Sequence, residues 1–219
     1  MSTVLKNRRN GYFLDFGAFD GVNDSNTYYF EKYKGWQGIC VEPNPMWYAS
    51  TCAVRSCITA NYALWSESRK SLEFVDAHGL SSLASFKDAD MNAEARNKYT
   101  KQVLSVDTIT PTELLERFNA PEYIDYMSLD VEGVEAIVLQ ALDLKRYKIA
   151  LMTIEHNHVE DKRAEIRQIL GKLGYEVEDF WNDDFFFNKE ILKSKFGNDY
   201  NDPARSVMQT KEGYKHRVY

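Results

Sequence analysis

Short apolar runs, rich in β-branched and aromatic residues, alternate along the chain with segments whose apolar residues recur at helical spacing. Such an alternation is typical of βα units arranged around a mostly parallel sheet. The apolar runs predict strands at residues 12–16, 38–41, 57–60, 71–75, 103–106, 123–129, 149–154, 175–180 and 185–188. The chain is therefore predicted to be an α/β protein whose helices pack against its sheet.

The clearest helix start lies at Thr110, which can cap a helix that has Pro111 in its first turn and Glu113 as the capping-box partner. An earlier helix is expected to run from a cap at Asp24 or Ser25 to about residue 34. Further helices are predicted near residues 46–54, over residues 134–142, and over an apolar stripe that stops at Gly174. These helices connect the predicted strands.

Two stretches lack a clear period. Residues 76–100 mix Ser, Asp, Asn and Gly, which predicts a partly irregular insertion, and the polar segment after Lys189 predicts no element. The 219 residues are 44% hydrophobic and 27% charged, as in ordinary folded proteins, and this length suits one domain. We expect a single domain over residues 1–219, with a core at about 11–190 and a polar C-terminal tail at about 190–219.

Charge and cysteine content narrow the function classes. A net charge of −6 offers no broad attraction for phosphate backbones, so nucleic acid is not the expected partner. The three cysteines are odd in number and lack a C-x-x-C spacing, which favours reduced thiols over a disulfide framework or a zinc site. The N-terminus has no apolar core of a signal peptide, and no apolar run is long enough to cross a bilayer. These features predict a cytoplasmic protein without a membrane span.

The residues directly after the predicted strands are unusually acidic. In an open parallel sheet, ligands bind at the carboxyl ends of the strands, near the point where the strand order reverses. Here those positions hold Asp15, Glu42, Asp130, Glu132, Glu155 and His156. The candidate site is therefore a group of carboxylates at one edge of the sheet.

The first strand ends in a turn whose two glycines, Gly17 and Gly21, let the backbone approach a ligand closely. Glu42 ends the second strand, where a carboxylate can accept hydrogen bonds from ribose hydroxyls. The turn is not G-x-G-x-x-G, and Asp20 would repel a pyrophosphate. A cationic nucleoside without phosphates fits better, and S-adenosylmethionine is such a ligand, because its ammonium and sulfonium are attracted by Asp15 and Asp130.

Several blocks of the chain resemble the FkbM-type methyltransferases. They are the sequences FLDFGAFDG at 13–21, GICVEPNP at 38–45, VDTI at 106–109 and YIDYMSLDVEGVE at 123–135. Taken in order, the resemblance covers about residues 11–190, and its most specific part is D-V-E-G-x-E with E-P-N-P upstream. It implies a Rossmann-like class I methyltransferase fold, a single mostly parallel seven-stranded sheet with helices on both faces, and S-adenosylmethionine as methyl donor.

The resemblance also implies positions for the donor. Asp15, Gly17 and Asp20 would line its methionine end, Glu42 its ribose and Pro43 with Asn44 its adenine edge, while residues 61–64 would form an adenine-side loop. The predicted donor-binding residues are Asp15, Gly17, Ala18, Asp20, Gly21, Glu42, Pro43, Asn44, Tyr62, Ala63 and Asp130. The family often has a lysine two residues before the fourth-strand Asp, and Ser128 stands there in this chain.

Three residues are candidates for catalysis. A neutral imidazole at His156 could take a proton from an acceptor hydroxyl, although a histidine at a strand end is as often structural. Asp130 and Glu132 would alternate in direction along an extended chain, so Asp130 is assigned to the pocket and Glu132 is left as an acceptor ligand or base. Asp130, Glu155 and His156 could also hold Mg²⁺ or Mn²⁺, but nothing in their spacing demands a metal, and no metal ligand is assigned.

The resemblance favours O-methylation of a sugar hydroxyl, and a deoxyhexose such as rhamnose or fucose, in a glycan or a nucleotide sugar, is the expected acceptor. Two alternatives stay open: a non-catalytic nucleoside-binding module and an NAD(P)-dependent oxidoreductase. The Y-x-x-x-K match at Tyr28 and Lys32 falls on the first helix, not after the fourth strand, so it does not support the oxidoreductase. The sequence does not predict the oligomeric state.

Overall fold

The computed structural model describes residues 3–88 and 92–206, and its centre is a seven-stranded sheet. From edge to edge the strands are β10 (Glu176–Phe180), β11 (Asp183–Phe187), β9 (Lys148–Glu155), β8 (Tyr123–Leu129), β1 (Tyr12–Phe16), β2 (Gln37–Val41) and β3 (Ile58–Ala60). Neighbours from β9 to β3 pair parallel, whereas β11 pairs antiparallel with both β9 and β10. The sheet is therefore mostly parallel, as expected.

The strand order reverses between β1 and β8. The chain moves from β1 to β2 and β3 toward one edge, and β8 then returns to the other side of β1. The register aligns the last residues of these strands, because Phe16 lies opposite both Val41 and Leu129, and Leu129 lies opposite Ile154. The residues that follow the four strands consequently meet at one place, where open α/β sheets bind ligands.

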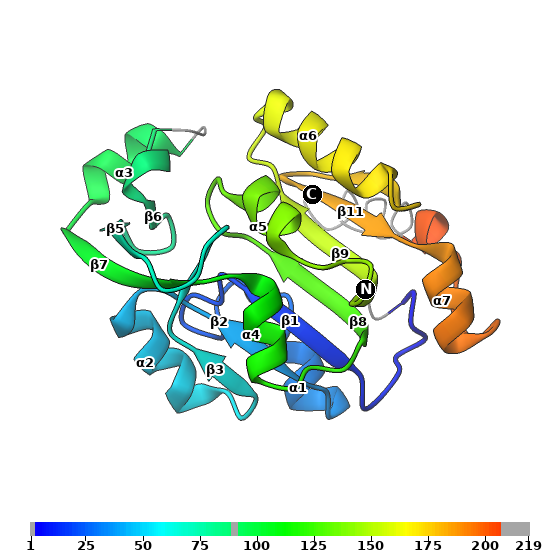
Figure 1. Ribbon diagram of the computed structural model, residues 1–219. Helices are drawn as coiled ribbons and strands as arrows, with labels where there is room; N and C mark the ends of the chain where they lie inside the picture. Colours follow the sequence, from blue (N-terminus) through cyan, green and yellow to red (C-terminus); the bar gives the residue numbers. More distant parts are fainter. Residues whose placement is uncertain (1–2, 89–91, 207–219) are drawn as a thin grey trace, which may run out of the picture.

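One face of the sheet is covered by α4 (Pro111–Arg117), α5 (Glu135–Ala141) and α6 (Glu160–Gly171) (Figure 1). Alternate strand residues point to this face, among them Leu14 and Met127. They form one buried cluster with Leu115, Val138 and Leu170 of the three helices.

The opposite face is covered by α1 (Tyr28–Lys34) and α7 (Lys189–Phe196). Phe13 packs here with Phe30 of α1 and with Leu192 and Phe196 of α7. The polar tail predicted after residue 190 is thus wrong up to residue 196, because the two apolar residues four positions apart bury one side of a short helix. Asn188 caps this helix, because its Oδ1 accepts hydrogen bonds from the N–H groups of Glu190 and Ile191 at 3.0 Å each.

A second sheet of four strands follows β3 in the sequence, so the expectation of a single sheet is wrong. Its order is β4 (Ala63–Leu64), β7 (Gln102–Ile109), β5 (Ser71–Asp76) and β6 (Ser82–Leu83), and η1 (Ala84–Phe86) and α3 (Ala93–Tyr99) complete the insertion (Figure 1). β4 pairs with the end of β7, Ala63 opposite Thr108 and Leu64 opposite Ile109, so the insertion begins and ends at the same point. Within residues 76–100, β6, η1 and α3 are regular and the other described residues are mostly turns, so the expected partly irregular insertion is confirmed in part.

The start of α4 agrees with its prediction, whereas the start of α1 does not. Thr110 caps α4 as predicted, since its Oγ1 accepts a hydrogen bond from the Glu113 N–H at 3.1 Å. α1 begins later than expected, because Asp24 has a left-handed backbone (φ 56°). Ser25 still supports the helix start by accepting the Tyr28 N–H at 3.1 Å. Helix α2 (Pro45–Val54) begins within one residue of its prediction.

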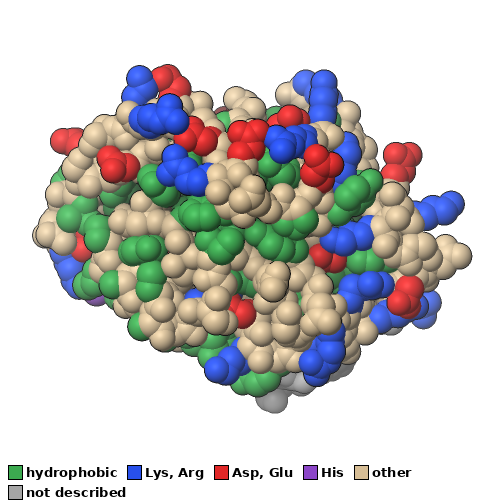
Figure 2. All heavy atoms as spheres, turned by 60° about the horizontal axis from the view of Figure 1, so that its bottom comes forward, with side chains coloured by type: hydrophobic (Ala, Val, Ile, Leu, Met, Phe, Trp, Pro, Cys, Tyr) green, Lys and Arg blue, Asp and Glu red, His purple; other side chains and the backbone are tan. Residues whose placement is uncertain are grey.

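The surface that carries α2, β3 and α4 is seen in Figure 2. Hydrophobic side chains occupy much of its middle, and lysine, arginine, aspartate and glutamate side chains are interspersed along its edges. No continuous basic area is visible on this face. Within the described residues, no helix combines the length and the apolar composition that a bilayer span requires.

Candidate functional site

A cavity of about 720 Å³ lies at the reversal point, between the ends of the parallel strands and the second sheet. Most of the residues predicted from the sequence line it, namely Asp15, Gly17, Ala18, Glu42, Pro43, Tyr62, Ala63, Asp130 and Glu132. The second sheet contributes Phe74 and Leu83 and the turn from His78 to Ser81. The size and the position suit a nucleoside together with a second, smaller ligand.

Gly17 joins the ends of β1 and β8. Its φ is +91°, and a Cβ at this position would lie 1.7 Å from the backbone oxygen of Asp130. The Asp130 N–H in turn donates to the Phe16 oxygen at 2.9 Å, and the Gly17 N–H donates to the Val41 oxygen at 3.0 Å. Only glycine allows the three strand ends to approach this closely.

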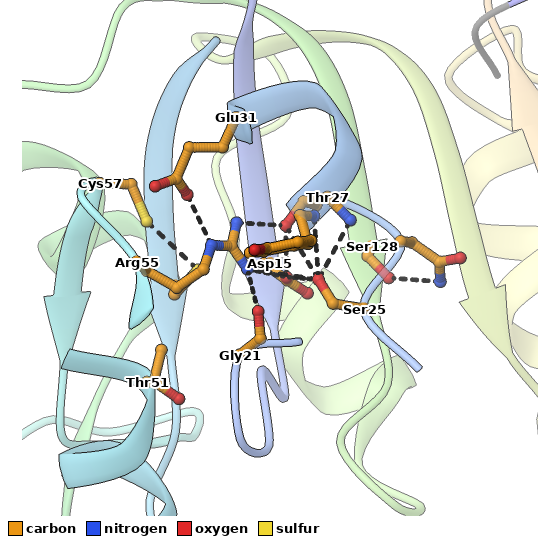
Figure 3. A network of polar contacts seen from close by, with 12 residues as sticks. Asp15, Gly21, Ser25, Thr27, Glu31, Thr51, Arg55, Cys57 and Ser128 are labelled. Atoms are coloured by element: carbon orange, nitrogen blue, oxygen red, sulfur yellow. Dashed lines mark hydrogen bonds and ion pairs between the residues drawn. The ribbon is translucent and has the colours of Figure 1, made fainter. Parts of the chain in front are cut away.

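Asp15 is held by a buried network that the sequence did not predict (Figure 3). Its Oδ2 accepts hydrogen bonds from Thr27 Oγ1 at 2.5 Å and Ser25 Oγ at 3.1 Å, and Arg55 Nη1 lies 3.4 Å away. Burial raises the pKa of Asp15, whereas the Thr27 hydroxyl, the charge of Arg55 and the Ser25 hydroxyl oppose that rise. The carboxylate predicted to attract the donor is therefore already paired with a cation.

Glu42 is fixed by backbone donors. Its Oε2 accepts the Phe19 N–H at 2.9 Å and its Oε1 accepts the Asn44 N–H at 2.8 Å. Burial raises the pKa of Glu42 to about 8, although these hydrogen bonds favour the charged form. Each carboxylate oxygen keeps a further lone pair, and Glu42 lines the cavity. The arrangement suits two neighbouring hydroxyl groups.

An apolar wall lies beside Glu42. Phe19, Pro43, Tyr62 and Leu64 line this part of the cavity, and the Phe19 ring packs on Trp47 with centroids 4.3 Å apart. The wall offers flat apolar surface next to the Glu42 carboxylate, an arrangement that suits an adenosine. Phe19 was not among the predicted residues, because an aromatic residue within a glycine turn carries no pattern of its own.

A second group of carboxylates lies at the ends of β8 and β9. Asp130, Glu132 and Glu155 each offer an oxygen within 4.8 Å of the others. Burial and the neighbouring carboxylates raise the pKa of both Asp130 and Glu155, so ionisation of one disfavours ionisation of the other. Asp183, which also lines the cavity, has its pKa raised to about 6 by burial and by Asp184.

Glu132 lines the cavity together with Asp130, contrary to the expectation that only one of them would. The expected alternation was wrong, because residues two apart on an extended chain lie on the same face. Moreover, β8 already ends at Leu129, and Glu132 has a left-handed backbone with φ 52°. The Glu132 carboxylate accepts a hydrogen bond from Arg96 Nη2 at 2.8 Å. Arg96 has no exposed surface and ties the insertion to this turn.

His156 does not line the cavity. Its Nδ1 accepts the His158 N–H at 3.1 Å, and its Nε2 lies 3.9 Å from Asp184 Oδ1, which is bound by Arg163 and Arg167. Burial and Arg163 lower the pKa of His156. The grouping of Asp130, Glu155 and His156 around a metal, considered from the sequence, is not formed: His156 lies instead near Asp179 and Asp184.

Three predicted donor-binding residues also do not line the cavity. Asp20 accepts hydrogen bonds from the Val22 and Asn23 N–H groups at 2.9 and 2.8 Å, so it shapes the turn. Gly21 has φ +83° and donates its N–H to the Ala18 oxygen at 2.9 Å. Asn44 caps α2 by accepting the Met46 N–H at 3.0 Å and donates to Asp76 at 3.0 Å. These residues support the site from outside it.

Residues 15–177 match the family model described as the methyltransferase FkbM domain. A solved structure of precorrin-6y C5,15-methyltransferase from Geobacter metallireducens GS-15 is similar at 12% identity and a TM-score of 0.41, over 82% of this chain and 79% of that chain. A methyltransferase structure from Pyrococcus furiosus is similar at 12% identity and a TM-score of 0.41, over 84% of this chain and 78% of that chain. No curated protein matches the chain.

Proposed function

Because this chain belongs to the FkbM methyltransferase family, we propose that it transfers a methyl group from S-adenosylmethionine to a hydroxyl group of a sugar. Membership supports methylation with this donor in general. The observation that carries the rest is the cavity at the strand reversal, with one fixed carboxylate at the end of β2 and a second carboxylate group at the ends of β8 and β9. One end suits the donor, and the other suits a hydroxyl that must lose a proton.

The donor end consists of Glu42, Asp15 and the apolar wall. The Glu42 oxygens, each held by one backbone N–H, would accept the two ribose hydroxyls. Pro43 and Tyr62 would flank the adenine, and the Gly17 turn would let the backbone approach the amino-acid end. When bound, the donor supplies a methyl group attached to a positively charged sulfur.

The acceptor end consists of Asp130 and Glu155. We assign Asp130 as the proton acceptor for the sugar hydroxyl, because its raised pKa makes the carboxylate a better base near neutral pH. The proton moves from the hydroxyl oxygen to a carboxylate oxygen of Asp130 and leaves through Glu155 to water. Glu132, bound to Arg96, would position the sugar. His156 has no part in this assignment, since it does not line the cavity.

Amide side chains support a sugar as the acceptor. Asn26, Asn157 and Asn182 line the cavity, and an amide both donates and accepts hydrogen bonds, as vicinal hydroxyls require. Leu80 and Leu83 add an apolar patch from the second sheet, which suits the methyl group of a deoxyhexose such as rhamnose or fucose. We propose this class of sugar, in a glycan or a nucleotide sugar.

Substitution of Glu42 tests the donor end. We expect Glu42→Ala to weaken S-adenosylmethionine binding about 100-fold in calorimetry, because the partner of two ribose hydroxyls is lost. Glu73→Ala, an exposed glutamate on β5, is the matched control and should leave the affinity unchanged. An unchanged affinity in Glu42→Ala would remove Glu42 from the ribose.

A labelled methyl donor and a panel of sugars, with and without EDTA, test the acceptor. We expect label transfer to a hydroxyl of a deoxyhexose. Tight donor binding without transfer to any sugar would favour a non-catalytic module, and stabilisation by NAD(P) but not by S-adenosylmethionine in a thermal shift assay would favour an oxidoreductase. Either result would contradict the proposed function.

A further inference from the structure

Arg55 follows α2 directly, and its side chain has no exposed surface. It reaches across to the start of α1 and the end of β1, where Figure 3 shows it between Glu31 and Asp15. Its partners are Glu31 at 2.5 Å from Nε, the Gly21 oxygen at 3.1 Å and Ser25 Oγ at 3.3 Å from Nη1, and Thr27 Oγ1 at 2.7 Å from Nη2. One guanidinium thus ties the end of α2 to Asp15, to the turn at Gly21 and to the start of α1.

The hydrogen bonds to Asp15 are one-sided. Within the described residues, those from Thr27, Ser25 and Arg55 all end on Oδ2. Asp15 nevertheless lines the cavity. The network therefore anchors one oxygen of the carboxylate and leaves the other oxygen available to a ligand.

The charges of the network do not cancel. Arg55 contributes one positive charge, and Asp15 and Glu31 contribute two negative charges, so the group is negative by one unit when all three are ionised. A buried group with an excess negative charge beside a cavity attracts a cation, and an ammonium also supplies the hydrogen-bond donors that a free carboxylate oxygen lacks.

We propose that Arg55 is a positioning residue that holds Asp15 as the receptor for the ammonium group at the amino-acid end of the donor. This inference rests on the proposed function. It implies that Arg55 affects the donor through one part of that molecule only. The adenosine part is bound by Glu42 and the apolar wall, which have no contact with Arg55 among those described above.

Calorimetry with three ligands tests this assignment. S-adenosylmethionine and S-adenosylhomocysteine both carry the amino-acid end, and 5′-methylthioadenosine lacks it. Arg55→Lys keeps the charge but replaces the planar fork with a single ammonium, whose three donors cannot serve all five partners of the guanidinium. We expect the first two ligands to bind about tenfold more weakly and methylthioadenosine to bind within about twofold of the unsubstituted protein.

Arg163→Lys is the matched control. Arg163 also binds a buried aspartate, Asp184, with its guanidinium, but it does not line the cavity. We expect this variant to bind all three ligands as the unsubstituted protein does. An equal loss of all three ligands in Arg55→Lys would show a purely structural role and would overturn the proposal, as would no loss at all.

Glu31→Gln keeps the proposal testable if Arg55→Lys does not fold. This substitution weakens the hydrogen bond from Arg55 Nε to residue 31, and Glu31 neither contacts Asp15 in the hydrogen bonds described above nor lines the cavity. We expect the same selectivity with a smaller loss, about threefold, and a loss without selectivity would overturn the proposal. If the unsubstituted protein binds methylthioadenosine but not S-adenosylmethionine, the assignment of Asp15 fails while a nucleoside site stands. If it binds none of the three, the proposed function fails and this inference with it.

Discussion

At the β1–β2 end of the cavity, the carboxylates of Asp15 and Glu42 are held by hydroxyl, guanidinium and backbone donors, whereas at the β8–β9 end those of Asp130 and Glu155 face each other. All four residues belong to strand ends of one sheet. What differs is the neighbouring chain: α2 supplies Arg55 at the first end, and β11 supplies a further carboxylate, Asp183, at the second.

The difference teaches how one residue type serves two purposes. A carboxylate with fixed donors keeps its place, which suits recognition of hydroxyl or ammonium groups. A carboxylate beside another carboxylate binds a proton more tightly, which suits proton transfer. The strand ends alone do not set the chemistry. The partners of each carboxylate do.

Gly17→Ala should have the largest effect, because it breaks the junction between the two ends. The added Cβ would lie 1.7 Å from the Asp130 oxygen at a φ of +91°. We expect the free energy of unfolding to fall by about 3 kcal/mol or more. Urea unfolding measures this loss, and donor binding should disappear with it.

Gly171→Ala provides the control for that substitution. Gly171 ends α6, and a Cβ there meets nothing within 4 Å. The substitution should raise the free energy of unfolding by up to about 1 kcal/mol. If the two alanine variants were equally stable, the close approach of β1 and β8 would be contradicted.

Glu155→Gln should show that the two ends differ in their proton binding. Burial and Asp130 raise the pKa of Glu155 in the folded protein. Between the unfolded-state pKa and this raised pKa, Glu155 is protonated in the folded protein and ionised in the unfolded one. Stability from this group is complete below about pH 4 and falls as the pH rises toward the folded-state pKa. We expect Glu155→Gln to reduce this fall by roughly 2–4 kcal/mol between pH 6 and pH 9.

Urea unfolding at the two pH values measures the effect, and Glu178→Gln on the edge strand β10 serves as the control. At pH 9 the Glu155→Gln protein should be more stable than the unsubstituted one. If Glu155→Gln were less stable than the unsubstituted protein at both pH values, the Glu155 carboxylate would be stabilised by its neighbours. The contrast between the two ends of the cavity would then be contradicted.

His156→Gln should have the smallest effect on methyl transfer. Because His156 does not line the cavity, we expect a change of less than about fivefold in the single-turnover rate with labelled donor. A loss of the general base would instead cost about 100-fold or more. A loss of that size would place His156 at the acceptor end after all. His158→Gln, the neighbouring histidine, is the control.

Local patterns predicted much of the fold. β8 follows a mostly apolar run and has the predicted bounds, and α4 starts at the Thr110 cap because that signal depends only on nearby residues. The second sheet was not predicted. β4 and β6 are two residues long, and β4 pairs with residues more than forty positions away, so neither forms a local pattern.

The candidate site was predictable where it depends on strand ends. The glycine turn, Glu42 and Asp130 were found because residues after parallel strands must meet. Arg55 was missed, because an arginine at the end of a helix is usually solvated and only the tertiary structure buries it. His156 was placed in the pocket for its position after β9, but the chain turns it toward Asp184 instead.

The second sheet leaves and rejoins the core at neighbouring residues, where Ala63 pairs with Thr108. One wall of the cavity is therefore assembled from segments scattered along the chain, and the other is encoded by one continuous stretch. A stretch with adjoining ends can be exchanged as one block while the core keeps its geometry. The wall that this stretch contributes, with Leu80 and Leu83, can thus vary while the strand ends that carry Asp15, Glu42 and Asp130 stay unchanged.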